Sequence, residues 1–210
     1  MKKDKIIEAE IVTDEKPYFF PRLIAYIIDI ILIGLVSSLI LTVIPTDSKK
    51  DTYMKEFELI QKDFLDKKID VSEYMSRSKD VVYEIDYIST PAVLIEVVLY
   101  IGYFIVFQTM NGGQTLGKKL MKIKVVSTKD SKLSFDQVTI RALIIDSIAI
   151  NVLMVAFILF LAKDYYYYGS LALQALSSLI VIVTLVMIFV RKDGRGLHDI
   201  AASTKVVNCK

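Results

Sequence analysis

Two carboxylates stand inside long apolar runs, where a charge requires a partner. Asp29 is the only charged residue among the 22 residues from Leu23 to Ile44, and Asp146 is the only one from Ala142 to Ala162. A carboxylate in the middle of a membrane helix costs about 2.5 to 3.5 kcal/mol on insertion scales. Such a residue therefore binds a cation, a proton or a polar ligand, or it pairs with a cationic side chain.

An arginine precedes each aspartate. Arg22 comes seven residues before Asp29, on the same face of a helix, and Arg141 comes five residues before Asp146. At 1.5 Å per residue, the two aspartates lie about 10 Å and 6 Å inside the cytoplasmic ends of their helices. One hypothesis is a polar cavity, open to the cytoplasm, that these four residues line. In the other, each acid pairs with an arginine or a backbone donor and only locks the helices together.

Four apolar segments position these residues. Of the residues, 54% are hydrophobic although 24% are charged, so the charges are segregated along the chain. We expect an all-α membrane protein, because each apolar segment approaches the length that crosses a bilayer. The expected membrane helices are about 22–44, 91–109, 141–162 and 171–190.

The segments outside these helices differ in character. Residues 45–90 are predicted to form an extracellular loop with an amphipathic helix from Tyr53 to Phe64. Residues 110–140 and 191–210 are predicted to form cytoplasmic segments with small interfacial helices and short strands. The arm 1–20 precedes the membrane domain 21–210, and around Glu8–Val12 it is either a short strand or flexible.

The distribution of Lys and Arg predicts the orientation. Seven basic residues face two acidic ones between Lys118 and Arg141, whereas the link between the last two membrane helices holds only Lys163 as a basic residue. By the positive-inside rule, both termini are expected in the cytoplasm.

Two segments that follow membrane helices share a pattern. When Gly113 is aligned with Gly194, Leu116 falls on Leu197, and Lys124-Val125-Val126 falls on Lys205-Val206-Val207. Together with the two arginine–aspartate pairs, this match predicts two parallel helix-hairpin repeats about a pseudo-two-fold axis, with the two Val-Val strands paired beneath the membrane.

Several chemistries are not expected. Gly112 to Lys118 has the spacing of a phosphate loop, but Lys119 stands where Ser or Thr would hold magnesium. His198 is the single histidine, so we expect it to close the cytoplasmic face with Asp199 rather than to bind a metal. Nucleophile, base and metal ligands do not converge, so we expect no enzyme, cofactor, metal or nucleic-acid partner.

Three motifs in order resemble the RDD family of bacterial membrane proteins. They are Pro21-Arg22-Leu23-x-Ala25-Tyr26-x-x-Asp29, Gly113-Gln114-Thr115-x-Gly117-Lys118 with Ile123-Lys124-Val125-Val126, and Leu197-His198-Asp199-x-x-Ala202-x-Thr204-x-Val206-Val207. The family is named for one arginine and two aspartates. The resemblance implies Arg22 and Asp29 as signature residues, with Asp199 or Asp146 as the second aspartate. It also implies a cytoplasmic family motif of Gly113, Thr115, Gly117, Lys118, His198 and Asp199.

The resemblance implies transport of ions or small ligands in the bacterial cell membrane. We expect a multi-pass transporter or transport subunit, for cation/proton exchange or small polar ligands. Asp29 would be the cation or proton site, Arg22 would tune its charge, and Asp146 would be the second carboxylate. Four membrane helices make a small pathway, so we expect a homo-oligomer in the lipid bilayer. The alternative is a non-transporting membrane scaffold or sensor that binds a protein or lipid partner.

Overall fold

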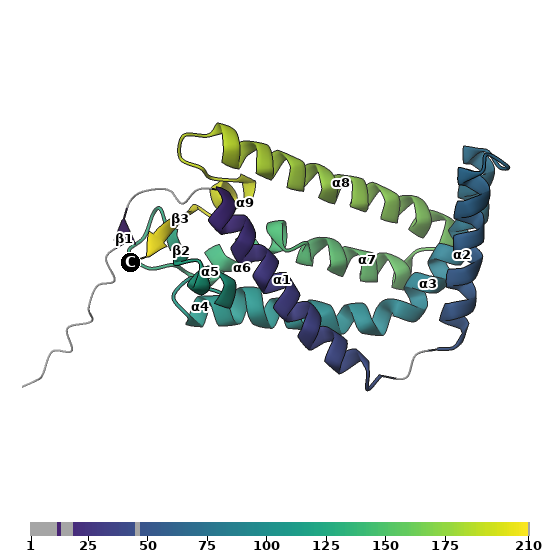
Figure 1. Ribbon diagram of the computed structural model, residues 1–210, viewed down its shortest axis with the longest axis horizontal. Helices are drawn as coiled ribbons and strands as arrows, with labels where there is room; N and C mark the ends of the chain where they lie inside the picture. Colours follow the sequence, from purple (N-terminus) through teal and green to yellow (C-terminus); the bar gives the residue numbers. More distant parts are fainter. Residues whose placement is uncertain (1–11, 14–18, 45–46, 210) are drawn as a thin grey trace, which may run out of the picture. The chain divides into compact units, whose positions relative to one another are not determined.

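The computed structural model describes residues 12–13, 19–44 and 47–209, and the chain is mostly helical (Figure 1). In this described part, three helices are long and apolar enough to cross a membrane: α1 (Phe19–Leu41), the helix Val71–Met110 and α8 (Lys163–Val190). The bent pair α6 (Phe135–Ile145) and α7 (Ile148–Phe160) is a further candidate. The prediction of several membrane helices is therefore confirmed.

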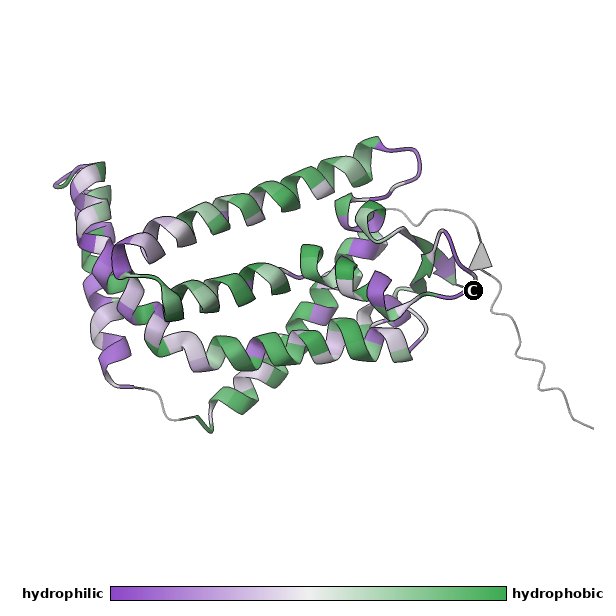
Figure 2. Cartoon of the chain, turned by 180° about the vertical axis from the view of Figure 1, so that it is seen from behind, coloured by the Kyte–Doolittle hydropathy of each residue, from purple (hydrophilic) through white to green (hydrophobic). Residues whose placement is uncertain are grey.

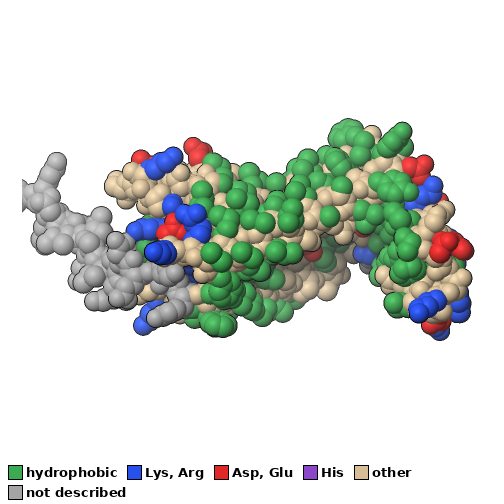
Figure 3. Space-filling model, turned by 90° about the horizontal axis from the view of Figure 1, so that it is seen from above, with side chains coloured by type: hydrophobic (Ala, Val, Ile, Leu, Met, Phe, Trp, Pro, Cys, Tyr) green, Lys and Arg blue, Asp and Glu red, His purple; other side chains and the backbone are tan. Residues whose placement is uncertain are grey.

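The surfaces of these helices are apolar. Figure 2 shows hydrophobic residues along most of α1, α7 and α8, whereas α2 (Lys49–Leu65) is mainly hydrophilic. On the face drawn in Figure 3, hydrophobic side chains form long patches and charged side chains gather in separate clusters. Exposed apolar area of this extent is uncommon on soluble proteins and is typical of helices that face lipid.

The second long helix begins earlier than its sequence suggested. α3 (Val71–Tyr100) starts behind the N-cap Asp70, whose side chain accepts from Glu73 N at 2.8 Å, and it continues through the π-helix Ile101–Phe107 and α4 (Gln108–Met110). The predicted start near residue 91 is wrong, because Pro91 lies inside the helix. Helices in membranes tolerate proline where nearby Ser and Thr hydroxyls bond to backbone carbonyls, as Ser89 and Thr90 do here.

The third apolar segment is broken rather than continuous. α6 ends at Ile145, and Ser147 then adopts a left-handed backbone conformation with φ 54° before α7 begins. A residue in this conformation cannot continue a right-handed helix, so the single helix expected for 141–162 is divided. α8 begins at Lys163, ahead of the expected residue 171.

The chain divides into two compact units. Unit 1 comprises residues 1–32, 103–142 and 183–210, and unit 2 comprises residues 33–102 and 143–182. The strand expected around Glu8–Val12 lies almost wholly outside the described residues.

Unit 1 contains a small antiparallel sheet. Its strands are β1 (Val12–Thr13), β3 (Thr204–Cys209) and β2 (Ile123–Ser127), in the order β1-β3-β2. Val125 opposes Val206, which confirms the predicted pairing of the two Val-Val strands. Both valines are buried with Ala25 of α1 in a core cluster. The sheet is therefore anchored to the first turns of α1.

β2 and β3 each follow a short helix, and the two helices have similar flanking residues. α5 (Leu116–Leu120) precedes β2, and α9 (Leu197–Ala201) precedes β3. A glycine with positive φ lies before each helix, and a residue with φ near 50° lies after it; these are Gly113 and Lys122 around α5, and Gly194 and Ser203 around α9. The pairs Lys124–Val207 and Val126–Lys205 lie symmetrically about Val125–Val206.

Unit 2 is built mainly from the end of α1, α2, α3, α7 and the first part of α8. The amphipathic helix predicted from Tyr53 to Phe64 lies within α2, where Ile60 is buried and the ring of Phe64 lies 4.8 Å from that of Tyr74 on α3. Ion pairs join α3 to the start of α8, one between Lys79 and Asp164 and the other between Lys163 and Glu84. α2 therefore packs on α3, and the two ion pairs join α3 to α8 in the same unit.

Candidate functional site

The carboxylate of Asp29 lies in unit 1 and is 1% exposed. Its Oδ1 accepts hydrogen bonds from Tyr103 Oη at 2.6 Å and from Gly117 N at 2.7 Å, and its Oδ2 accepts from Thr115 Oγ1 at 2.5 Å. Thr115 is the N-cap of α5, and its hydroxyl accepts from Lys118 N. Asp29 therefore fastens the start of α5 to α1.

The backbone around α5 fixes the direction of both hydroxyl protons. Tyr103 Oη accepts from Leu116 N at 3.0 Å, and Thr115 Oγ1 accepts from Lys118 N at 3.3 Å. Each hydroxyl has one proton, which remains available for the carboxylate. All three neighbours thus donate to Asp29. An ionised carboxylate is a pure acceptor, so it matches these three donors.

Two glycines of the predicted cytoplasmic motif allow close contacts. A Cβ on Gly117 would lie far inside contact distance of the carbonyl oxygen of Ala25 and 2.8 Å from Oδ1 of Asp29. At Gly113, where φ is 90°, a Cβ would run into the carbonyl oxygen of Val125. The glycines are therefore required so that α5 can approach α1 and β2.

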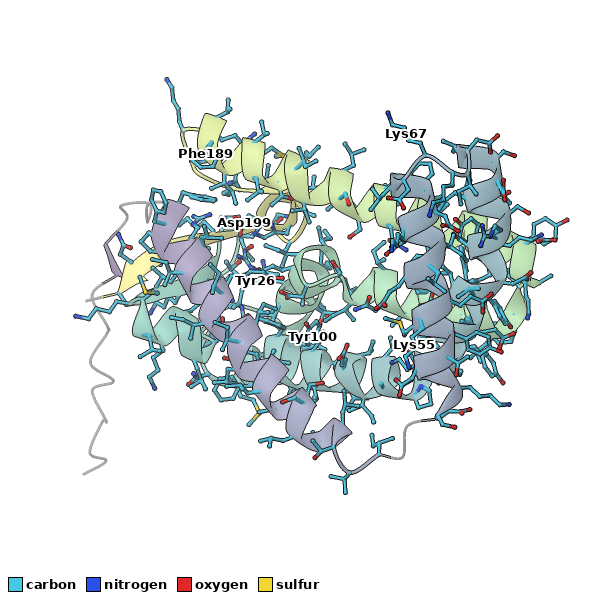
Figure 4. All side chains as sticks on the ribbon, turned by 45° about the vertical axis from the view of Figure 1, so that its right-hand side comes forward. Tyr26, Lys55, Lys67, Tyr100, Phe189 and Asp199 are labelled. Carbon is cyan, nitrogen blue, oxygen red and sulfur yellow. The ribbon has the colours of Figure 1, made fainter. Side chains whose placement is uncertain are left out.

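Asp199 is the centre of a second buried network in unit 1, and Figure 4 marks its place. The side chain is 0% exposed. Arg141 Nη1 donates to Oδ1, while Arg22 Nη1 lies 3.5 Å from Oδ2 and Gly196 N donates to Oδ2 at 3.2 Å. Arg22 also donates to Gly194 O at 2.6 Å. One carboxylate on α9 thereby holds arginines from α1 and α6.

His198 completes this network. Its Nε2 lies 3.4 Å from Asp199 Oδ2, and its ring is 1% exposed. Burial is the main cause that holds the pKa of His198 well below its usual 6.5, and nearby positive charges add to the effect; they belong to Arg141, Arg22 and Lys118. The imidazole is therefore neutral near pH 7. Its Nδ1 is buried without a hydrogen-bond partner in the part of the chain that the structure describes.

Sequence comparison decides the family of this molecule. The model of the RDD family matches residues 16–203, which is most of the chain. The chain belongs to the RDD family. A search of curated proteins and a search of solved structures each returned no match. The resemblance inferred from the three motifs is therefore confirmed.

The structure assigns the signature residues of this RDD protein to two networks. Arg22 bonds to Asp199, whereas Asp29 accepts from two hydroxyls and from the backbone N–H of Gly117. The structural hypothesis left open an arginine or a backbone donor as the partner of Asp29, and the structure shows the backbone donor. Neutral donors already occupy the oxygens of Asp29, and the guanidinium of Arg22 is turned toward Gly194 and Asp199. The direct contact favours Asp199 as the second signature aspartate.

Asp146 belongs to unit 2, while Asp29, Arg22 and Arg141 belong to unit 1. Asp146 is buried, with 6% of its surface exposed. The cavity that it was expected to share with Asp29 stays a prediction. Among the described residues of this RDD protein, no group of three or more His, Cys, Asp or Glu side chains could hold a metal ion.

Two partners in these networks, Tyr103 and Gly196, were not anticipated, whereas Thr204 belongs to the third motif. Tyr103 lies in an apolar run, where one more tyrosine carries no distinguishing signal. Thr204 Oγ1 lies 3.3 Å from both Arg141 Nη1 and Asp199 Oδ1. The role of Gly196 as the N-cap of α9 was predictable, because Asp199 lies three positions later. An acidic residue at that position is a known signal for a helix start.

Proposed function

We propose that this RDD protein is a membrane transporter or transport subunit for ions, and that it exchanges a cation for a proton at Asp29. The observation that supports this is the charge balance of Asp29. Its partners Tyr103, Thr115 and Gly117 are all neutral, and within the described residues no Lys or Arg forms an ion pair with it. A buried carboxylate on a membrane-type helix, with no cationic side chain paired to it, is a candidate site for a cation or a proton.

Asp29 retains capacity to bind such a charge. An ionised carboxylate offers about four lone-pair positions. Within the described residues three are used, and Oδ2 accepts only the bond from Thr115. The hydroxyl oxygens of Tyr103 and Thr115 lie within hydrogen-bond distance of Asp29. They are of the oxygen type that alkali cations and protons bind.

Asp199 differs from Asp29 and has a structural role in this proposal. Two arginines compensate its charge, and breaking such a buried pair is costly. Arg22 therefore holds the cytoplasmic segment on α1 and does not tune Asp29. Asp146 remains the candidate for a second titrating carboxylate.

The proposal includes four membrane helices arranged as two helix hairpins. The matched pairs α5–β2 and α9–β3 support it, since their glycines, helices and left-handed residues recur with a constant offset. The symmetric pairing about Val125 and Val206 is also what a local two-fold axis requires. The bent pair α6–α7 would be the third crossing.

The charge distribution and the family support a proposed location. We place the protein in the bacterial cell membrane as a multi-pass protein with both termini in the cytoplasm. Its partners would be the lipid bilayer, monovalent cations, protons and further copies of the chain. We assign it no enzymatic activity, because the hydroxyls of Tyr103 and Thr115 beside Asp29 also accept from backbone N–H groups of α5 and so hold that helix in place.

Flux measurements in proteoliposomes test the proposal. The full chain should acidify or alkalinise the lumen when a sodium or potassium gradient is imposed. Asp29→Asn should abolish this flux, because the neutral amide cannot exchange a proton for a cation. Asp130→Asn is the matched control, since Asp130 is an exposed carboxylate in the same unit. Equal flux for the wild type and Asp29→Asn would reject Asp29 as the site.

A non-transporting scaffold or sensor is the second candidate. The buried network of Arg22, Asp199 and Arg141 favours this second function. The network fixes α9 to α1 and α6, which would give a partner a rigid cytoplasmic surface to bind. A protein or lipid partner that binds Asp29→Asn as tightly as the wild type, with no flux of any ion, would support this function instead.

A further inference from the structure

A cavity of about 130 Å³ lies within unit 2, between α3, α7 and α8. Four of its lining residues are polar and the others are apolar. The polar residues are Asp86, Thr90, Asn151 and Tyr166. None of them belongs to the networks around Asp29 and Asp199.

Asp86 contributes a carboxylate with one oxygen unused. Its Oδ2 accepts from Tyr166 Oη at 2.7 Å, and Tyr166 is 1% exposed. The ring of Tyr83 meets that of Tyr166 edge to face at 5.4 Å, which fixes the position of the hydroxyl. Within the described residues, Oδ1 of Asp86 takes part in no hydrogen bond or ion pair. A negative oxygen is thus available beside the cavity.

Three neutral oxygens accompany it. Thr90 Oγ1 donates its proton to Asp86 O at 2.9 Å, and Tyr166 Oη donates to the carboxylate. Both hydroxyls keep lone pairs for another partner. The side-chain amide of Asn151, in the first turn of α7, has no hydrogen-bond partner in the described part of the chain. The cavity therefore offers oxygen acceptors from Asp86, Thr90, Tyr166 and Asn151, alongside the N–H donors of the Asn151 amide.

The position of the cavity suits an ion that enters from water. The ion pair of Lys163 with Glu84 forms a charged layer on unit 2, and Asp86 follows Glu84 by two residues, about 3 Å further along α3. On α7 the lining residues Ile158 and Asn151 are seven residues apart, about 10 Å. The cavity thus extends from the charged layer into an apolar part of the unit.

We propose that this cavity binds one monovalent alkali cation, with Asp86 as the charged ligand and Thr90, Asn151 and Tyr166 as neutral oxygen ligands. The charge of a single carboxylate matches that of a monovalent cation better than that of a divalent one. A calcium site uses about six to eight oxygens, usually with several carboxylates, which these four residues do not supply. Binding of the cation at this site does not depend on the proposed function. A role of the site in cation/proton exchange does rest on the proposed function.

Equilibrium binding of radioactive sodium to the full chain in detergent tests the site. Because Asp29 is a separate candidate, binding is measured in the wild type and in the Asp29→Asn background, with choline chloride as the baseline and potassium as competitor. We expect a saturable component that Asp86→Asn removes in both backgrounds. Asp80→Asn is the matched control, because Asp80 is exposed on the same helix, and it should bind as the wild type does.

Tyr166→Phe gives a milder variant in case Asp86→Asn fails to fold. It removes one oxygen ligand and keeps the ring, so we expect sodium affinity to fall about tenfold, which corresponds to about 1.4 kcal/mol. Size-exclusion profiles and circular dichroism establish that each variant is folded. Unchanged sodium binding in folded Asp86→Asn would overturn this inference, even if flux persists. Binding at Asp86 without any flux would overturn only the proposed exchange.

Discussion

The hydroxyl oxygen of Tyr103 lies 2.6 Å from Oδ1 of Asp29 and also accepts from the backbone N–H of Leu116. One phenol thereby bonds both to α1 and to the first residue of α5. Because a single hydroxyl serves as donor and acceptor, its loss leaves an unsatisfied group on each side.

Tyr103→Phe should destabilise the protein by about 1 to 3 kcal/mol. The ring and its stacking on Phe107 at 5.4 Å are retained, so the loss reports the hydroxyl alone. The measurement is the shift of the unfolding transition in detergent. Tyr168→Phe is the control, because Tyr168 is 54% exposed, and it should leave the transition in place. Equal transitions for the two variants would show that the bond to Asp29 contributes nothing.

Gly117→Ala should be more damaging than an ordinary glycine substitution. Its Cβ would overlap the carbonyl oxygen of Ala25 and press on Asp29, so α5 must move away from α1. Overpacking of this kind costs about 1 to 3 kcal/mol. In Gly34→Ala the new Cβ meets nothing within 4 Å, so that variant should match the wild type or exceed it in stability.

Thermal unfolding of the two glycine variants side by side measures the difference. A Gly117→Ala protein as stable as Gly34→Ala would mean that α5 does not need the close approach seen here. Exchange flux in the same Gly117→Ala protein is a second readout, because displacement of α5 removes Thr115 and the Gly117 N–H from Asp29.

The apolar helices and the paired Val-Val strands were predictable from sequence, because each rests on a local pattern. Long runs without charge specify membrane-type helices, and Lys124-Val125-Val126 repeated as Lys205-Val206-Val207 specifies matching strands. The start of α3 was missed because proline usually ends or begins a helix, and Pro91 predicts such a boundary. The hydroxyls of Ser89 and Thr90 bond to backbone carbonyls beside Pro91, and these bonds are visible only in the structure.

Sequence reasoning named residues of both networks but did not predict how they pair. Arg22, Asp29 and Asp199 were all singled out, yet helical spacing suggested Arg22 with Asp29. Spacing along one helix measures only which face a residue occupies. The partner of Arg22 lies 177 positions away. Arg22 contacts Asp199 because α9 packs near the start of α1, and sequence spacing does not predict such a long-range contact.

Stability should depend on pH through His198. Its pKa is held well below 6.5 in the folded protein, mainly by burial, whereas in the unfolded chain it returns to about 6.5. The unfolded state therefore binds more protons below about pH 6.5, and stability must fall as the pH falls through that value. Above about pH 7 the contribution is constant.

His198→Gln should flatten this dependence. We expect the wild type to lose up to about 1.4 kcal/mol per pH unit, relative to the variant, as the pH falls from about 6 to about 5. Unfolding transitions at matched ionic strength measure both curves. The same slope for wild type and His198→Gln would show that His198 is not the group that titrates.

Asp199→Asn tests the network that joins the two arginines. The substitution leaves Arg22 and Arg141 buried with their counter-charge removed, and loss of one partner of a buried ion pair costs about 3 to 5 kcal/mol. Asp193→Asn is the matched control: Asp193 also lies between two arginines, Arg191 and Arg195, but its side chain is 37% exposed. Exposed pairs contribute about 0 to 1 kcal/mol, so that variant should remain close to the wild type. If Asp199→Asn unfolds at the same denaturant concentration as Asp193→Asn, the Asp199 network does not hold α9 on α1.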